Sequence, residues 1–211
     1  MRIEIAILTK SSKHGGFCVA GIDLASGEWV RLTSENESTH GALQLGDMQY
    51  EDKKYCNTLD VVSVEIKGRN PSKYQPENVL IDPEYYWEKT GEYSIIDILR
   101  LHQPEHHQFL LGNQYSYITE AKIGDVGYSL TLIYVTSLII RQTINQKGKL
   151  KTKASFQYGL CYYENISVTD PEYYNVPDGT KIGNAILVVS LPDAPYPDDR
   201  YYKFVAQIFM Q

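Results

Sequence analysis

Short runs of apolar residues that alternate with polar ones dominate the first third of the chain. The runs are rich in valine and isoleucine, which favour strands, and a period of two is typical of a strand with one buried face. A further strand of this kind is predicted over 58–67, and the glycine-containing segment 25–28 predicts a hairpin between two earlier strands. Those earlier strands are predicted over 3–8, 17–24 and 29–32.

The middle of the chain predicts an irregular connection followed by short helices. Three prolines break the segment 70–89, which is therefore expected to be irregular. Ser94 is placed to cap a helix over 95–101, and Asp97 stands three residues later, where a capping box needs a carboxylate. After a proline, a second short helical piece is predicted over 105–111.

Strand patterns return in the second half of the chain. A β-rich pattern on both sides of a short helical stretch predicts a mainly β protein built from two small barrels. We expect barrels over 1–92 and 113–211 with a helical connection over 93–112, and a single larger sandwich is the alternative. The strands predicted in this half cover 130–140, 155–163, 185–191 and 203–210.

One short motif, Asp-Pro-Glu-Tyr-Tyr, occurs twice, at 82–86 and at 170–174. The displacement of 88 residues is about the length of one small domain, as tandem duplication of a fold would give. Chance is the alternative explanation, because the residues that flank the two copies do not match.

Composition excludes several classes of protein. With 43% hydrophobic and 22% charged residues, the chain is not disordered, collagen-like or of low complexity. A net charge of −6 argues against a globally basic domain that binds nucleic acid, so any basic surface must be local. Tyrosine is unusually frequent, with 18 residues against 5 Phe and 2 Trp. Most are expected to be half-buried, and a few exposed ones would form a stacking platform.

The cysteines and the apolar segments indicate a compartment. Cys18, Cys56 and Cys161 are too few and odd in number for a disulfide framework, which favours a reducing, cytoplasmic location. Glu4 interrupts what would be the core of a signal peptide. The most apolar stretch, 130–140, has eleven residues and is too short to span a bilayer, so no membrane partner is expected.

The segment 9–16, between the first two predicted strands, is the first candidate site. Ammonium, hydroxyl and imidazole groups next to a Gly-Gly pair are what a phosphate-binding loop needs, although the P-loop motif is absent. A polar hairpin loop is the alternative interpretation. Arg31 in the third strand is either a bidentate phosphate donor on the same surface or a solvent-facing strand residue. The candidate ligand-contacting residues of the loop are Lys10, Ser11, Lys13 and His14.

A run of alternating lysines is the second candidate site. In an extended chain their ammonium groups lie on one face, and Arg141 has the same parity upstream. Cations beside aromatic rings are what single-stranded nucleic acid uses on open β surfaces. A hairpin edge that lysines protect against association is the alternative. The lysines are Lys147, Lys149, Lys151 and Lys153, and the aromatic residues that follow are Phe156, Tyr158, Tyr162 and Tyr163.

Motifs for catalysis, metals and cofactors are missing from the sequence. His102, His106 and His107 lie close together, but a proline interrupts the helix that would align them and no cysteine pair completes a zinc shell. His14 and Cys18 have no third residue placed to orient them, which argues against a Cys–His nucleophile. We therefore expect no metal, no cofactor and no enzymatic activity.

Two segments resemble a known family. Leu-Thr-Lys-Ser-Ser-Lys-His-Gly-Gly-Phe-Cys-Val-Ala-Gly-Ile-Asp at 8–23, followed by Gly-Glu-Trp-Val-Arg-Leu at 27–32, resembles the opening of the prokaryotic dual OB domain-containing family. Tyr-Lys-Phe-Val-Ala at 202–206 is similar to the C-terminal strand of that family. The resemblance implies two tandem OB-like β-barrels that recognise nucleic acid or a nucleotide in bacterial defence systems. By position, it assigns ligand contact to Lys10, Lys13, His14 and Arg31.

The leading hypothesis is a non-enzymatic module that binds nucleic acid or a nucleotide through these basic residues and the alternating lysines, with stacking on nearby rings. The alternative is a protein-interaction or assembly domain, because tyrosine is enriched in the cores of interfaces. A third hypothesis, an enzyme acting on a phosphorylated small molecule at 10–16, lacks a nucleophile or paired carboxylates.

Overall fold

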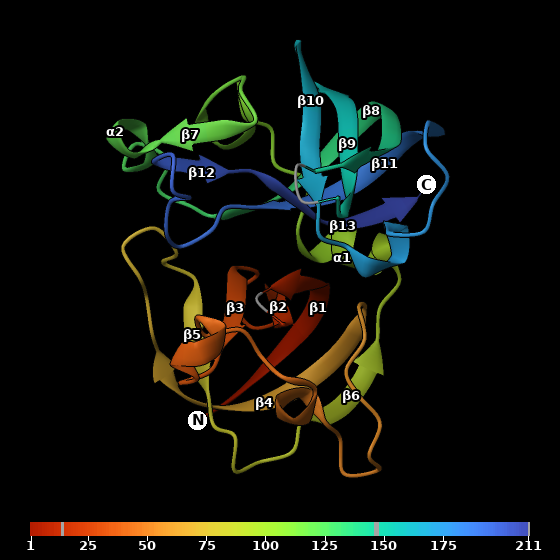
Figure 1. Ribbon diagram of the computed structural model, residues 1–211. Helices are drawn as coiled ribbons and strands as arrows, with labels where there is room; N and C mark the ends of the chain where they lie inside the picture. The colour runs from red at the N-terminus through yellow and green to blue at the C-terminus, as the bar shows by residue number, and fades with distance from the viewer. Residues whose placement is uncertain (14, 146–147, 211) are drawn as a thin grey trace. The chain divides into compact units, whose positions relative to one another are not determined.

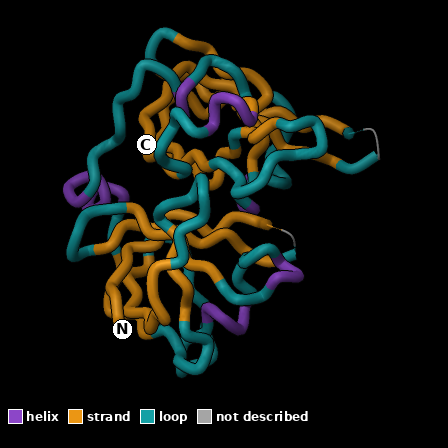
Figure 2. The backbone as a smooth tube through the Cα atoms, turned by 90° about the vertical axis from the view of Figure 1, so that its left-hand side faces the viewer, coloured by secondary structure: helices purple, strands orange, loops and turns teal. Residues whose placement is uncertain are grey.

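The computed structural model describes residues 1–13, 15–145 and 148–210. The chain divides into two compact units, Met1–Gln103 and Pro104–Gln211 (Figure 1). Figure 2 shows that strands make up much of the backbone, with only short helices between them. Each unit contains a ring of five paired strands, which confirms the prediction of a mainly β protein with two small barrels. The division between the units falls inside the segment 93–112, and the helix of that segment belongs to the first unit.

The first unit has the strand order of an OB barrel, in which the first strand pairs with both the second and the fourth. The third and fifth strands run parallel, and the other pairs of the ring are antiparallel. A sixth strand, β6 (Glu88–Glu92), pairs with the fourth outside the ring. The ring consists of β1 (Arg2–Lys13), β2 (Gly16–Asp23), β3 (Trp29–Thr33), β5 (Asn78–Ile81) and β4 (Asp60–Arg69).

Alternation along β1 builds the core of the first barrel. Ile5 and Ile7 point inward and are fully buried in the same cluster as Val64 of β4. The two strands of the β1–β2 pair approach closely at Gly21, where a Cβ atom would come within 2.0 Å of the carbonyl oxygen of Ala6. Only glycine fits there, so this glycine sets the tight curvature of the barrel.

The second unit repeats the same strand order, again with a parallel pair between its third and fifth strands. Its closed barrel consists of β8 (Leu130–Ile144), β9 (Leu150–Tyr158), β10 (Cys161–Val168), β13 (Phe204–Met210) and β11 (Thr180–Ser190). Two short strands of this unit, β7 (Tyr117–Thr119) and β12 (Arg200–Tyr202), form a separate antiparallel sheet. Helix α2 (Glu120–Ile123) follows β7 directly.

Helix α1 (Ile95–Leu101) begins as the sequence predicts. The Ser94 hydroxyl accepts a hydrogen bond from the Asp97 amide at 3.3 Å, and the Asp97 carboxylate accepts one from the Ser94 amide at 3.0 Å. The capping box is therefore confirmed. Short 3₁₀ turns cover Glu37–Thr39, Leu45–Met48, Leu110–Gly112 and Pro171–Tyr173. Among the described residues, no helix is long and apolar enough to cross a membrane.

Several predicted elements have a different structure. The segment 105–111 is not helical apart from the turn at its end, and the Leu110 amide donates to the Tyr163 hydroxyl at 2.9 Å instead of to a carbonyl four residues earlier. The segment 155–163 is not one strand but the end of β9 and the start of β10, and Gly159 at φ 56° turns the chain between them. The segment 70–89 is irregular except for β5 and the first residues of β6.

The repeated Asp-Pro-Glu-Tyr-Tyr motif does not mark the repetition of the fold. The copy at 82–86 follows the fifth strand of the first barrel, whereas the copy at 170–174 follows the third strand of the second barrel. In each copy the aspartate accepts a hydrogen bond from the amide two residues later, at 3.3 Å for Asp82 and 3.1 Å for Asp170. The motif is therefore a local turn that occurs twice at non-equivalent positions.

Candidate nucleic-acid interface

The β8–β9 hairpin presents basic side chains on the outside of the second barrel. Thr152 and Ala154 of β9 face the interior and are buried, so Lys151 and Lys153 point outward by alternation. Arg141 of β8 lies directly opposite Lys153 in the ladder, and cross-strand partners share a face. The predicted alternation of Lys151 and Lys153 with Arg141 is therefore present in the structure.

A fourth cation joins this group from a distant part of the chain. Lys181 of β11 pairs with Ile139 of β8, which stands two residues before Arg141 and so shares its outward side. We call Arg141, Lys151, Lys153 and Lys181 the basic face; it crosses the three adjacent strands β11, β8 and β9. Lys149 lies in the β8–β9 connection, where its backbone amide donates a hydrogen bond to the Asn145 side-chain oxygen at 2.9 Å. Lys147, predicted as part of the alternation, lies outside the described residues.

The charges of the basic face are poorly compensated. Within the described chain, none of its four side chains forms an ion pair with a carboxylate. The Lys153 ammonium donates to the Ser167 hydroxyl at 2.8 Å, and burial together with the neighbouring Lys151 lowers the pKa of Lys153. One carboxylate stands nearby, that of Asp178, which accepts a hydrogen bond from the amide after Arg141 at 2.9 Å. The face is a surface on which an anion would relieve repulsion between cations.

The aromatic residues that follow the lysines belong mainly to the core, against the prediction that they stack with a ligand. Phe156, Tyr158 and Tyr163 are buried. The rings of Phe156 and Tyr163 stack on each other with their centroids 5.8 Å apart. The Tyr163 hydroxyl accepts from the Leu110 amide at 2.9 Å, and burial raises the pKa of Tyr163 to about 12. Only Tyr162 of this group is exposed, at 47%.

The prediction that a loop begins at residue 9 of the first unit is wrong, because strand β1 extends to Lys13. The chain from 9 to 13 continues β1, because the hydroxyl residues Thr9 and Ser11 face inward and are buried at 0% and 3% exposure. The Lys10 ammonium donates to the Cys56 carbonyl at 2.7 Å, and that of Lys13 donates to the His40 carbonyl at 3.0 Å. These lysines therefore hold neighbouring loops of their own unit. His14 lies outside the described residues.

Arg31 is not a surface residue, which corrects its assignment as a phosphate donor. Its side chain is 4% exposed, and its guanidinium donates to the Glu77 carboxylate at 2.9 and 3.0 Å and to Cys18 Sγ at 2.8 Å. Burial opposes the charge, but Cys18 and Glu77 outweigh that effect and raise the pKa of Arg31. The residue forms a buried ion pair that joins β3 to the segment before β5.

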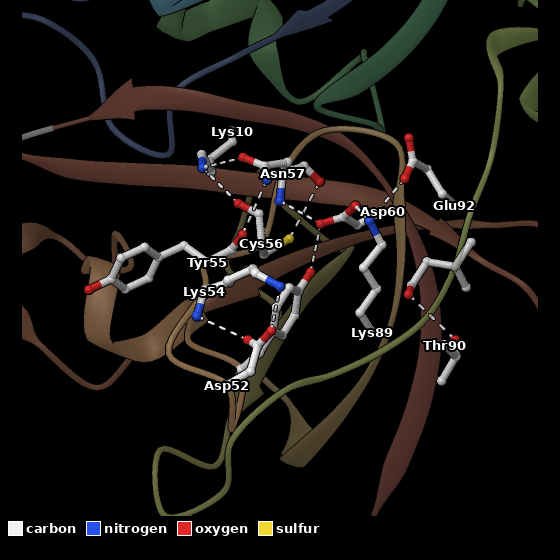
Figure 3. A network of polar contacts seen from close by, with 12 residues as sticks. Lys10, Asp52, Lys54, Tyr55, Cys56, Asn57, Asp60, Lys89, Thr90 and Glu92 are labelled. Atoms are coloured by element: carbon white, nitrogen blue, oxygen red, sulfur yellow. Dashed lines mark hydrogen bonds and ion pairs between the residues drawn. The ribbon is translucent and has the colours of Figure 1, made fainter.

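A second polar cluster lies in the first unit (Figure 3). It borders a concavity of about 660 Å³. At its centre the buried Asp60 carboxylate accepts from the Tyr50 hydroxyl at 2.7 Å and from the Asn57 amide at 2.8 Å, and it pairs with Lys89 at 2.5 Å. Burial raises the pKa of the neighbouring Cys56 thiol to about 12, which keeps it protonated. The cations that line the concavity each contact a carboxylate: Arg2 with Glu65 and Glu88, Lys54 with Asp52, and Lys89 with Asp60 and Glu92.

The cluster around Asp60 is therefore saturated by its own chain and offers neither an anion site nor a free base. In the part of the chain that the structure describes, no group of three or more His, Cys, Asp or Glu side chains is placed to hold a metal ion. His102 instead contacts the Gly27 carbonyl at 3.0 Å through Nδ1, and His107 contacts Glu105 at 3.2 Å.

Part of the basic face lies on a strand through which OB barrels contact oligonucleotides. OB barrels that bind oligonucleotides use the face of their second and third strands together with the loops between strands one and two and between strands four and five. In the second unit these are β9 and β10, the β8–β9 connection and the β11–β13 connection. Lys149, Lys151 and Lys153 lie on the first of these loops and on the second strand. The alternation of lysines in the sequence predicts the part of the basic face on β9. No pattern in the neighbouring sequence indicates that Lys181 belongs to it.

Comparison with protein-family models supports the architecture. The model of a dual OB-containing domain matches residues 3–208, nearly the whole chain. Among solved structures, the Ifi202 HINa domain in complex with 20-bp double-stranded DNA is 13% identical, with all of this chain and 95% of that chain covered and a TM-score of 0.37. The tetrameric p202 HIN2 structure is 8% identical, with coverage of 100% and 91% and a TM-score of 0.36. No curated protein matches.

Proposed function

The chain belongs to the dual OB-containing domain family, and we propose that it is a non-enzymatic module that binds nucleic acid through the basic face of its second barrel. The observation that supports the proposal is the set of cations on adjacent outward-facing strands, which form no ion pairs within the described chain. Two of these cations, Lys151 and Lys153, lie on the second strand of the barrel, which is part of the surface through which OB domains contact oligonucleotides.

The spread of the cations favours a polymer over a single nucleotide. The face crosses from β11 through β8 to β9, and two strand spacings amount to about 10 Å. A duplex carries a phosphate on each strand about every 3.4 Å of helix axis, so more than one phosphate would lie along this face. Burial and the neighbouring Lys151 lower the pKa of Lys153, and a phosphate beside this ammonium group would favour its charged form.

The proposal that the protein has no enzymatic activity is supported by the polar cluster of the first unit. The Asp60 carboxylate is fully engaged by a tyrosine, a backbone amide and a lysine. Burial raises the pKa of Cys56, so this thiol is a poor nucleophile.

Binding is tested by fluorescence anisotropy with a labelled oligonucleotide at 50 and 200 mM salt. For a single-stranded oligonucleotide, three or four phosphate contacts predict that affinity falls about 20- to 50-fold over this range. The variant with Lys151→Glu and Lys181→Glu is expected to lose binding at both salt concentrations. A control with the same change in net charge reverses Lys54 and Lys122, whose side chains are 80% and 73% exposed and lie outside the basic face.

The control variant is expected to stay within a few-fold of the wild type. Equal losses in the two variants would mean that only net charge matters and would refute the basic face as the site. A wild-type chain that binds no oligonucleotide at 50 mM salt would overturn the proposal and favour a protein-interaction domain.

A further inference from the structure

The small β7–β12 sheet of the second unit has one buried side and one aromatic side. In its ladder Tyr201 lies opposite Ile118, and both are 1% exposed, so this pair faces the interior. By alternation, Tyr202 and its partner Tyr117 face the other way, together with Arg200. The inner pair anchors the sheet, whereas Tyr117 and Tyr202 on the outer side are only half-buried.

Further rings extend this outer side into a connected group. Tyr115 stacks on Tyr117 with centroids 6.1 Å apart and planes inclined by 22°. Tyr117 lies 5.9 Å from Tyr202, which meets Tyr196 edge-on at 5.3 Å. Tyr115 and Tyr196, at the two ends of the group, are 56% and 45% exposed. We call Tyr115, Tyr117, Tyr196 and Tyr202 the tyrosine surface.

A guanidinium group completes this surface. The Cζ atom of Arg200 lies 4.2 Å from the centroid of the Tyr117 ring, within the range of a cation–π contact. The Asp198 carboxylate accepts from the Tyr202 hydroxyl at 2.6 Å and lies 3.8 Å from the Arg200 guanidinium. The charges of Arg200 and Asp198 thus largely cancel, so what the surface offers a ligand is flat π faces that are already fixed in place.

The position of the tyrosine surface in the barrel indicates what it contacts. Tyr196 and Tyr202 lie in the connection between β11 and β13, the fourth and fifth strands of the second barrel. OB domains contact oligonucleotides through the loop between strands one and two and through the loop between strands four and five. The tyrosine surface lies at the latter loop, and the basic face includes the strand that follows the former. Stacking of successive bases on aromatic rings is the recurrent way in which such proteins hold single strands.

We propose that the tyrosine surface stacks unpaired bases and that the ligand class is therefore single-stranded nucleic acid. The inference rests on the proposed function, because the basic face supplies the phosphate contacts. The basic face alone does not separate single strands from duplexes, since both present phosphates. Base faces are covered by their neighbours in a duplex and are accessible in a single strand, so exposed tyrosine rings select the single strand.

The test compares a single strand of about 20 thymidines with a duplex of the same length. In the variant with Tyr115→Leu and Tyr196→Leu, affinity for the single strand is expected to fall about tenfold or more, because the π faces are lost while apolar area remains. The salt dependence of binding should not change, since no phosphate contact is removed. Tyr115→Phe with Tyr196→Phe keeps the rings and should retain affinity. Tyr85→Leu, at a tyrosine 53% exposed in the first unit, is the matched control.

Failure of this inference is distinguishable from failure of the proposed function. Unchanged affinity in the leucine variant, or an equal loss for the duplex, overturns stacking and leaves the basic face in place; the tyrosine surface would then serve another class of partner. No binding of either oligonucleotide by the wild type at 50 mM salt removes both proposals.

A second measurement does not depend on the folding of any variant. A single strand that contains 5-iodouridine is crosslinked by light to the unmodified protein, and the adducts are mapped by mass spectrometry. Adducts on the tyrosine surface support the inference, and adducts confined to other residues overturn it.

Discussion

Replacing Glu77 is expected to destabilise the first unit strongly, although the residue lies in an irregular segment. Its carboxylate accepts two hydrogen bonds from Arg31, at 2.9 and 3.0 Å, and the two side chains are 7% and 4% exposed. Loss of one partner leaves the other charge buried without compensation, which costs about 3–5 kcal/mol. That is a large fraction of the roughly 5–15 kcal/mol that stabilises a typical domain.

The size of the loss depends on the replacement. Glu77→Gln keeps an amide oxygen that accepts one hydrogen bond from Arg31 and should lie near the lower limit of that range. Glu77→Leu removes every acceptor and should reach the upper limit. The double variant with Arg31→Met and Glu77→Leu removes both charges and should recover most of the stability, because an apolar pair of similar volume replaces a buried ion pair with little net cost.

Urea unfolding followed by tryptophan emission measures these effects in the full chain. Both tryptophans, Trp29 and Trp87, belong to the first unit, so their emission follows that unit selectively. A loss below about 1 kcal/mol for Glu77→Leu would refute the reasoning, since it would place the ion pair in the range of exposed pairs. The folded double variant should also bind oligonucleotide like the wild type, because Arg31 lies in the interior of the first unit.

Two further effects are expected in the second unit. Asp178→Asn keeps the hydrogen bond that the side chain accepts from the Gln142 amide but removes a negative charge beside Arg141. Oligonucleotide affinity at 50 mM salt should therefore rise about two- to fivefold. An unchanged or weaker affinity in anisotropy titrations would count against the basic face. Burial raises the pKa of Asp170 from 3.8 to about 6. Between these two pH values the folded state binds a proton that the unfolded state has released. The stability of the second unit should therefore fall by up to about 3 kcal/mol as the pH rises through this range, and then level off. Urea unfolding followed by far-ultraviolet circular dichroism should show this slope in the wild type and lose it in Asp170→Asn; equal slopes in both proteins would contradict the assignment.

The sequence predicts most of the barrel strands because alternation of apolar residues is a local signal that survives folding. It fails at the end of β1, where Thr9 and Ser11 occupy inward positions with hydroxyl groups that are typical of loops. It fails at Arg31 because the partner carboxylate stands 46 residues away and becomes adjacent only when β3 pairs with β5. A charged residue in an apolar strand is therefore ambiguous until its partner is known.

The candidate sites divide in the same way. The parity of Lys151 and Lys153 predicts their common face, because side-chain direction in a strand depends on local geometry alone. Lys181 joins them through pairing of β11 with β8, which no local pattern announces. The tyrosine surface escapes detection because strands of three residues are too short to show a period, and its two halves lie far apart in the sequence.

The two barrels share a strand order but differ in how they use their charges. The first unit holds 11 basic and 16 acidic side chains, and the second holds 9 and 10. In the first unit many cations are held by neighbouring carboxylates, those of Arg2, Arg31, Lys54, Lys67 and Lys89 among them. In the second unit the basic face lacks such partners in the described chain. Because a cation already paired with a carboxylate gains little from a phosphate, this difference in pairing favours the second unit over the first as the proposed site of binding.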